Sequence, residues 1–403
     1  MKKSTHRSKR NRKAAIKRRL NRLKFLRKEL ALDDREENEL VDRVSELPDE
    51  ILISILSRLT LPQAIATSIL STRWRYLHTY IDHLKFPPFI LNSSQFKELY
   101  PRGRRGVKVS HYVSAINKTL DSYRGNGVLE EFRVEMHYVK GANIERWLEF
   151  ALDRQVKIVD IRMCKMKITG GFYTLNLLNL IGRPLPGFKC LKQLYFHGVH
   201  VDDLEVQLLL SNFPLLESLT IEFSTRLRNV SVVGNGMILK LKRLDISYAG
   251  YLKSIEIRDM INLISFKCYG HQSRYVLRLS NLPKLIEFSI SEEHAKNTLA
   301  VLLPTIPSYI HDQLRLLKVW IPHPHLIQTH LPAYELINVK HLELKVYIEA
   351  RYSTFQLFPL IEACSSLEKL EIEQKVVSKS KKFDNVGIFR KRGRIGICFG
   401  HDE

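Results

Sequence analysis

Three short stretches decide the fold: LKQLYF at residues 191–196, LESLTI at 216–221 and LKRLDI at 241–246. Each has apolar residues at its first, fourth and sixth positions. In an extended chain the fourth and sixth residues point to one side and the fifth to the other. Each stretch therefore predicts a strand with one buried and one exposed face.

The same pattern recurs along most of the chain, with Ile, Val or Phe replacing some leucines. Most intervals between starts fall within the roughly 20 to 29 residues of a leucine-rich repeat. Such units bury their apolar faces only by stacking into a solenoid, which predicts a parallel sheet on its concave side. The starts are Leu129, Val156, Leu191, Leu216, Leu241, Leu263, Leu285, Leu314, Val339 and Leu367.

The segments between these strands distinguish the solenoid from a closed α/β barrel. A barrel would place recognisable helices there, whereas residues 224–240 are rich in Gly, Asn and β-branched residues. A further apolar pattern at 252–257 falls between two repeats and predicts an extended piece on the convex side. The asparagine typical of regular repeats is generally missing, so we expect an irregular solenoid.

A different pattern fills residues 42–77. Pro48, followed by Asp49 and Glu50, is typical of a helix start. The apolar residues that follow, from Ile51 to Leu59, have helical spacing. TLPQ at 60–63 has the form of a capping box for a second helix, and a third is expected from Ser71. Three short helices bury little apolar surface, which indicates a bundle that is stabilised by contact with a partner.

This block resembles the F-box of plant ubiquitin-ligase receptors through LPDEIL (47–52), ILSRL (55–59), ATSILS (66–71) and RWRYL (73–77). Together with the repeats it resembles the plant F-box/LRR-repeat family, whose opening repeat is similar to residues 144–161. Residues 358–370 look like the start of that family's C-terminal module, FBD, but the chain departs from it after Glu373. The resemblance implies an α/β fold, namely a small all-α three-helix F-box followed by the irregular solenoid.

The resemblance also implies a non-catalytic subunit of an SCF-type E3 ubiquitin ligase. The F-box would bind a Skp adaptor, and through it a cullin-RING scaffold, while the repeats would bind an unknown protein substrate. No nucleophile elbow, Walker loop or zinc-protease motif is present. We expect no enzymatic activity and no cofactor.

Two groups of residues are candidates for these contacts. The family's apolar and Leu-Pro positions give the adaptor contacts: Leu47, Pro48, Ile51, Leu52, Ile55, Leu59 and Trp74. Outward strand positions occupied by aromatic or basic residues give candidate substrate contacts, since such residues often anchor interfaces. These are Tyr195, Arg243, Tyr269, Lys318 and Trp320.

The net charge of +22 is concentrated at the N-terminus, where fourteen Lys and Arg occur between Lys2 and Lys28 and leave +8 (22 minus 14) for the rest. This segment is expected to be a disordered arm. Its clusters look like a nuclear-import signal, which predicts an importin-type carrier and a nuclear location, otherwise cytoplasmic. The second interpretation is a merely solvated arm. The signal residues would be Lys9, Arg10, Arg12, Lys13, Lys17, Arg18 and Arg19.

Other function classes receive less support. A nuclear nucleic-acid-binding protein using the basic arm, or an F-box scaffold outside the ligase, are the alternatives. The repeats lack regular aromatic and basic interleaving, which argues against nucleic acid. No apolar run approaches the roughly 18 residues of a membrane helix, so no membrane partner is expected.

The cysteines and histidines indicate no metal site. Cys164, Cys190, Cys268, Cys364 and Cys398 are scattered and predict reduced, mostly buried thiols. His323 and His325 form a pair without a third ligand in sequence reach, which is typical of a polar loop.

The predicted organisation has five parts. It comprises a basic arm with an acidic end at 1–40, the F-box at 41–85, a linker at 86–127, the solenoid at 128–373 with the FBD-like start at 358–373, and a basic tail at 374–403.

Overall fold

The structure is a computed structural model that describes residues 44, 46–86, 105–125, 127–136, 141–163, 175, 180, 185–234, 240–269, 275–291, 306–321, 335–349, 357–377 and 392–398. The chain divides into two units, residues 1–52 and 53–403. The basic arm and the pair His323 and His325 lie outside the described residues.

Two short helices follow the predicted pattern of the F-box block. Helix α2 spans Asp49–Leu56 and carries Asp49 and Glu50 in its first turn, where the helix dipole favours negative charge. Helix α3 spans Leu61–Ala66 after Thr60, whose backbone N–H donates to Gln63 Oε1 at 3.1 Å. The predicted capping box is therefore confirmed.

The third predicted helix is not an α-helix. After the 3-10 helix η1 (Thr67–Ile69), the chain forms turns up to the 3-10 helix η2 (Leu77–Tyr80). The backbone N–H of Trp74 donates to Ser71 Oγ at 3.4 Å, which closes one of these turns. So short a segment gains too few backbone hydrogen bonds to nucleate an α-helix.

All ten predicted repeat strands are present in one twelve-stranded sheet. They are joined by β1 (His83–Lys85) at one edge and β15 (Arg392–Cys398) at the other, and the strand order follows the chain. The repeat strands are β2 (Glu131–Met136), β3 (Ile158–Met163), β4 (Gln193–His197), β5 (Ser218–Glu222), β7 (Arg243–Ser247), β9 (Ser265–Cys268), β11 (Glu287–Ser291), β12 (Leu316–Ile321), β13 (His341–Glu349) and β14 (Lys369–Val377).

The inward apolar residues align in register across these strands. Leu194 pairs with Leu219, Leu219 with Leu244, and Leu244 with Phe266. The row continues through Phe288, Leu317 and Leu342 to Leu370. All are buried, and each contributes roughly 1.5 to 3 kcal/mol of burial free energy. This row is the core of the solenoid.

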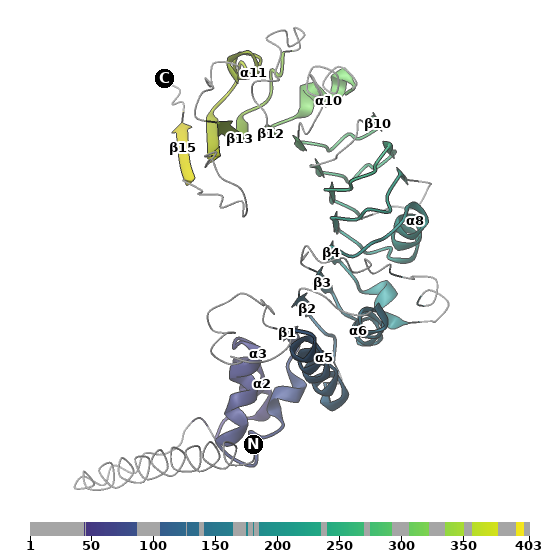
Figure 1. The fold of residues 1–403 in the computed structure, drawn as a ribbon, viewed down its shortest axis with the longest axis vertical. Coiled ribbons are helices and arrows are strands. Elements are labelled where there is room, and N and C mark those ends of the chain that lie inside the picture. The colour runs from purple at the N-terminus through teal and green to yellow at the C-terminus, as the bar shows by residue number, and fades with distance from the viewer. Residues whose placement is uncertain are drawn as a thin grey trace, which may run out of the picture. The chain divides into compact units, whose positions relative to one another are not determined.

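The return segments carry a second sheet and several helices. Strands β6 (Asn229–Val233), β8 (Ser254–Arg258) and β10 (Val276–Ser280) form a parallel three-stranded sheet. The extended piece predicted at 252–257 is β8, which confirms that prediction. Helices α5, α6 and α8 and strand β10 lie on one side of the larger sheet (Figure 1). The helices are α5 (Arg105–Ser122), α6 (Gly141–Asp153), η3 (Pro186–Lys189), α8 (Asp203–Asn212), α10 (Ser308–Gln313) and α11 (Phe358–Glu362).

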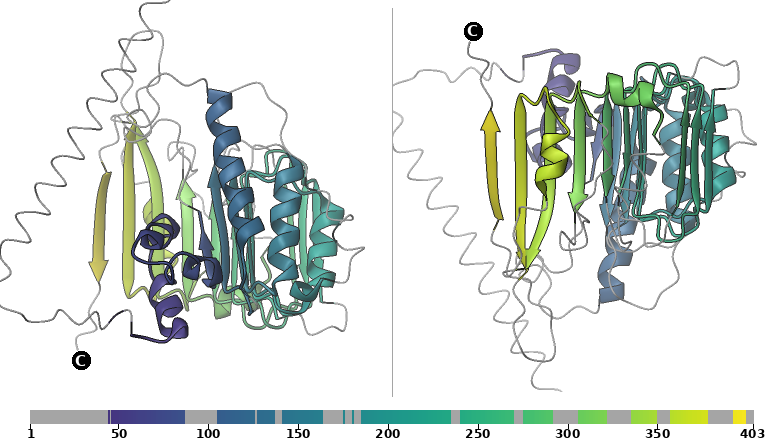
Figure 2. Two further views of the ribbon diagram at one scale, coloured as in Figure 1. Left: turned by 90° about the horizontal axis from the view of Figure 1, so that it is seen from below. Right: turned by 90° about the horizontal axis from the view of Figure 1, so that it is seen from above.

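Both ends of the solenoid differ from the predicted boundaries. Helix α5 lies inside the predicted linker, and β1 pairs in parallel with β2 inside the predicted F-box. At the other end, β14 runs to Val377 and β15 pairs with it in antiparallel fashion, opposite to its neighbours in Figure 2. The sheet therefore extends into the predicted tail.

Three of the five cysteines have described side chains. Cys268 and Cys364 are buried and Cys190 is half-buried, and all three are free thiols. Burial raises the pKa of the Cys364 thiol to about 12, so this side chain is uncharged near neutral pH.

Candidate functional site: an apolar helical surface and a polar sheet face

The F-box block leaves several large apolar side chains exposed. Ile51 and Ile55 are four residues apart on α2 and therefore share a helix face, and Ile51 is 48% exposed. Leu59 is also exposed, although it lies beyond the end of α2. Pro48 is exposed and Leu47 is half-buried. These five predicted adaptor residues are within reach of a partner.

The other two predicted adaptor residues belong to the core. Leu52 is 0% exposed and Trp74 is also buried. Leu52 follows Ile51 directly, and consecutive residues on a helix point in different directions. Both side chains thus pack inside this chain, and their contact with an adaptor stays a prediction.

The sequence reasoning missed part of the exposed surface. Ile69 is 86% exposed, and Leu70, Ile65 and Tyr76 are exposed as well. The adjacent pair Ile69 and Leu70 in the stretch ATSILS could have indicated this exposure. A helix buries only one of two consecutive apolar residues well. We call Ile51, Ile55, Leu59, Ile69 and Leu70 the exposed apolar residues of the F-box.

The second candidate is the polar face, which we define as the side of the larger sheet that carries Asp160, Tyr195, Asp245, Lys267, Lys318 and Glu343. These side chains alternate with the buried apolar row, as predicted. Cross-strand ion pairs connect many of them. At the N-terminal end, Arg133 Nε lies 2.8 Å from Asp160 Oδ2 and Arg162 Nε lies 2.8 Å from Asp160 Oδ1.

The middle of the polar face holds a four-residue network of charged groups. Lys267 Nζ lies 2.5 Å from Asp245 Oδ2 and 3.3 Å from Glu222 Oε1. His197 Nδ1 lies 2.9 Å from Glu222 Oε2. The contact with His197 lowers the pKa of Glu222 despite its burial, with help from Lys267. Burial raises the pKa of Asp245, because it outweighs the attraction of Lys267.

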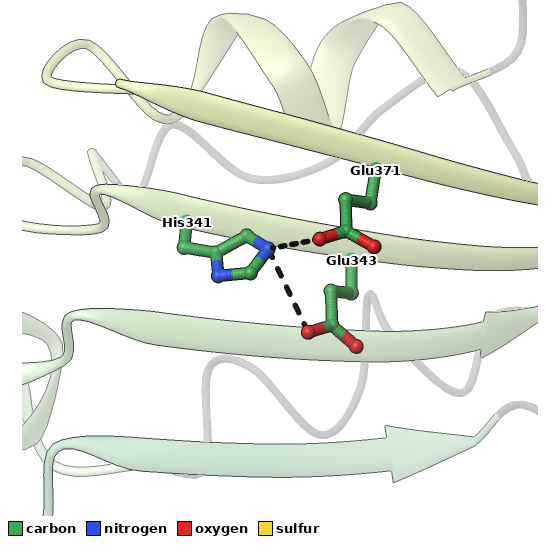
Figure 3. Close-up of side chains that lie close together, drawn as sticks. All are labelled: His341, Glu343 and Glu371. Atoms are coloured by element: carbon green, nitrogen blue, oxygen red, sulfur yellow. Dashed lines mark ion pairs between the residues drawn. The ribbon is translucent and has the colours of Figure 1, made fainter. Parts of the chain in front are cut away.

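Further along the sheet, Figure 3 shows His341, Glu343 and Glu371 pointing toward one another. His341 Nε2 lies 3.6 Å from Glu343 Oε1 and 3.4 Å from Glu371 Oε1. Histidine and carboxylates are common metal ligands. However, Lys318 Nζ lies 2.7 Å from Glu343, and Lys369 Nζ lies 2.6 Å from Glu371. We interpret the group as an ion-pair network, because ammonium groups already occupy both carboxylates.

The predicted substrate residues fall into two sets. Tyr195 and Tyr269 are half-buried and Arg243 is exposed, so a partner can reach them. Lys318 is half-buried and paired with Glu343. Trp320 was predicted to project outward, but only 9% of it is exposed. Its ring packs against Tyr269, at 6.2 Å between centroids, which the alternation within one strand cannot reveal.

Trp320 and Tyr269 belong to a larger group, the aromatic row, which consists of Phe223, Tyr248, Tyr269 and Trp320. Phe223 and Tyr248 stack with centroids 4.4 Å apart and planes at 4°, and Tyr248 meets Trp320 edge-on at 5.8 Å. Phe223 and Tyr248 escaped the sequence reasoning because they lie just after β5 and β7. The available signal was that Gly198, Phe223 and Tyr248 follow one another at intervals of 25 residues.

In the part of the chain that the structure describes, no helix is long and apolar enough to cross a membrane.

Comparisons with known proteins identify the families of both parts of the chain. The F-box domain family matches residues 44–77, and the family described as "At1g61320/AtMIF1, LRR domain" matches residues 120–393. The second match alone covers more than half of the chain.

Three Arabidopsis thaliana proteins are among those with similar sequences. F-box/FBD/LRR-repeat protein At1g51370 is 24% identical over 82% of this chain and 74% of its own length. FBD-associated F-box protein At4g10400 is 29% identical over 62% of this chain and 61% of its own. F-box/LRR-repeat protein At2g42730 is 27% identical over 57% of this chain and 52% of its own. The matches thus span between about half and three quarters of these relatives.

Proposed function

Since this chain belongs to the plant F-box proteins with leucine-rich repeats, we propose that it is the substrate-recognition subunit of an SCF-type E3 ubiquitin ligase. Members of this family are typically non-catalytic adaptors, and an F-box implies binding of a Skp-type adaptor. In this proposal the F-box holds the adaptor and the repeats hold the target protein.

The exposed apolar residues of the F-box are the observation that carries the proposal. Ile51, Ile55 and Leu59 project from or just beyond α2, and Ile69 and Leu70 add further apolar area. Exposed apolar surface beyond scattered single residues commonly marks a protein contact, and these five residues all fall between positions 51 and 70. An adaptor that covered these side chains would gain about 25 cal/mol of binding free energy for each Å² of apolar surface removed from water.

The mechanism that follows is proximity. A target held on the repeats would lie near the ubiquitin thioester that is carried by the conjugating enzyme of the assembly. Tethering raises the effective concentration of the target lysine and converts a bimolecular encounter into an intramolecular one. No reacting group is required from this chain.

The polar face favours a protein target over nucleic acid. Basic side chains such as Lys85, Arg133 and Lys267 are each paired with a carboxylate on the same face. Nucleic-acid binding relies instead on unpaired cations that neutralise phosphates. The target contacts that we propose are Tyr195, Arg243, Tyr269 and Lys318.

The adaptor contact can be tested with Ile51→Asp combined with Ile55→Asp. A buried carboxylate without a partner is strongly unfavourable, and loss of a central apolar anchor typically costs about 2 kcal/mol or more. We expect adaptor capture in a pull-down to fall at least tenfold. Leu47→Ala with Pro48→Ala should act in the same direction.

A matched control is Leu204→Asp, which changes an exposed leucine of α8 outside the F-box. It should leave adaptor capture unchanged. Normal capture by the Ile51 and Ile55 double variant, with circular dichroism like that of the wild type, would overturn the proposal.

A further inference from the structure

Two rings of the aromatic row stand where glycine would suit the backbone better. Phe223 and Tyr248 follow β5 and β7 with φ values of 60° and 58°, and Gly198 follows β4 with φ of 70°. The three turns are equivalent. The N–H of Gly198 donates to Glu222 O at 2.8 Å, that of Phe223 to Ser247 O at 3.0 Å, and that of Tyr248 to Tyr269 O just after β9.

A left-handed backbone disfavours any side chain beyond hydrogen, so the turn gives no reason for an aromatic residue at either position. Strained residues of this kind often serve a binding site. The position of the two rings is a second indication of a binding site. Phe223 and Tyr248 are only half-buried and stack on one another beside the polar face.

Next to the aromatic row, carboxylates outnumber ammonium groups in the network around Lys267. Two carboxylates, Glu222 and Asp245, share the single ammonium group of Lys267. Without His197, the formal charges of these three groups sum to −1, from two carboxylates and one ammonium group. His197 also lies against Phe223, with ring centroids 4.7 Å apart, so the charged network and the aromatic row are adjacent.

We propose that the aromatic row and its carboxylates bind an arginine side chain in a basic segment of the target protein. The proposal rests on the proposed function, because it names the class of target that the polar face would take. A guanidinium group is planar and stacks on aromatic rings, and its donors can also reach carboxylates. The same rings already lie beside cations of this chain, since Lys267 Nζ is 5.1 Å from the centre of the Tyr269 ring.

The charge distribution argues against the other ligands that aromatic rings can hold. An acidic segment or a phosphate group would meet the surplus carboxylate. An uncharged aromatic side chain could stack on the rings but would make no use of Glu222 and Asp245. These alternatives are outcomes of the following test.

The test uses the full-length chain in complex with its Skp adaptor, and a phage-displayed library of short random peptides as the probe. Peptides selected on the wild-type complex should be enriched in arginine at one position. Replacing that arginine by glutamine in a synthetic peptide should weaken binding about tenfold, the size expected for one partly desolvated cation–π contact. Enrichment in acidic or only in uncharged aromatic residues would overturn the proposal.

The chain offers a discriminating variant, Phe223→Gly with Tyr248→Gly. Glycine already occupies the equivalent turn at Gly198, so the double variant should fold. It should bind the arginine and the glutamine peptide equally weakly. Phe223→Tyr with Tyr248→Phe keeps both rings and should retain the preference for arginine. Retained preference in the folded glycine variant would show that the rings are not the site.

A third variant, Glu222→Gln, separates the charge from the rings. It should reduce the preference for arginine over glutamine while leaving binding of the glutamine peptide unchanged. Adaptor capture is measured on the same preparations. Loss of adaptor binding would contradict the proposed function alone, whereas intact adaptor binding without arginine selection would contradict this inference alone.

Discussion

Single residues of the polar face show how buried charge is tolerated there. Asp160 is 1% exposed, yet both of its oxygens are within 2.9 Å of a guanidinium nitrogen of Arg162. Arg133 approaches the same carboxylate from the neighbouring strand. The hydrogen bonds that Arg162 donates to Asp160 raise the pKa of Arg162. A buried carboxylate that is bound on both oxygens is stable, whereas one that loses its partners is costly.

At the same scale, Glu222 should make stability depend on pH. The contact with His197 lowers the folded-state pKa of Glu222 below its ordinary value of 4.5. The ionised carboxylate therefore stabilises the fold above pH 4.5, and this contribution disappears as the pH falls through the lowered pKa. Glu222→Gln should reduce the free energy of unfolding by on the order of 1 kcal/mol at neutral pH and by much less near pH 3.

Urea unfolding at both pH values measures this difference. Glu217→Gln is the control, because Glu217 lies just before β5 and pairs with the exposed Lys242, and exposed pairs contribute little. An equal loss for Glu222→Gln at both pH values would contradict the assignment to ionisation.

At the scale of elements, the alternation of apolar residues predicted the strands well. Leu219 and Ile221 are buried while Thr220 between them is half-buried, and most other repeat strands alternate in the same way, although Asp160 of β3 and Ser289 of β11 are buried too. The pattern is local, so it found each strand. It could not find contacts between side chains of distant repeats, and the burial of Trp320 by Tyr248 and Tyr269 was missed for that reason. Helix α5 was also missed, because its apolar residues are few.

The basic arm is an element known only from its sequence, and its prediction stands as a proposal. Deleting residues 2–28 removes fourteen positive charges. In a fluorescent fusion this deletion should shift the protein out of the nucleus, since import carriers bind such clusters. Replacing Lys379, Lys381 and Lys382 in the other basic segment should leave the distribution unchanged. An unchanged distribution after the deletion would favour a merely solvated arm.

At the scale of the whole molecule, the repeats contact mainly their neighbours. Each strand of the larger sheet pairs with the next repeat, and the inward row from Leu194 to Leu370 is shared between adjacent units. In such an array, stability is approximately a sum over repeats and their interfaces. A defect in one repeat therefore weakens its neighbours first, and the two terminal strands have the fewest contacts.

The antiparallel strand β15 at the end of this array should protect the protein from aggregation. It pairs with β14 from Lys369 to Lys375 and so covers backbone groups that would otherwise be an open edge. Open edges recruit strands from other molecules. Deleting residues 391–403 should therefore produce concentration-dependent aggregates in light scattering, whereas deleting 399–403, which spares β15, should not. Strand β15 would then prevent polymerisation of the protein, independently of the recognition of any target.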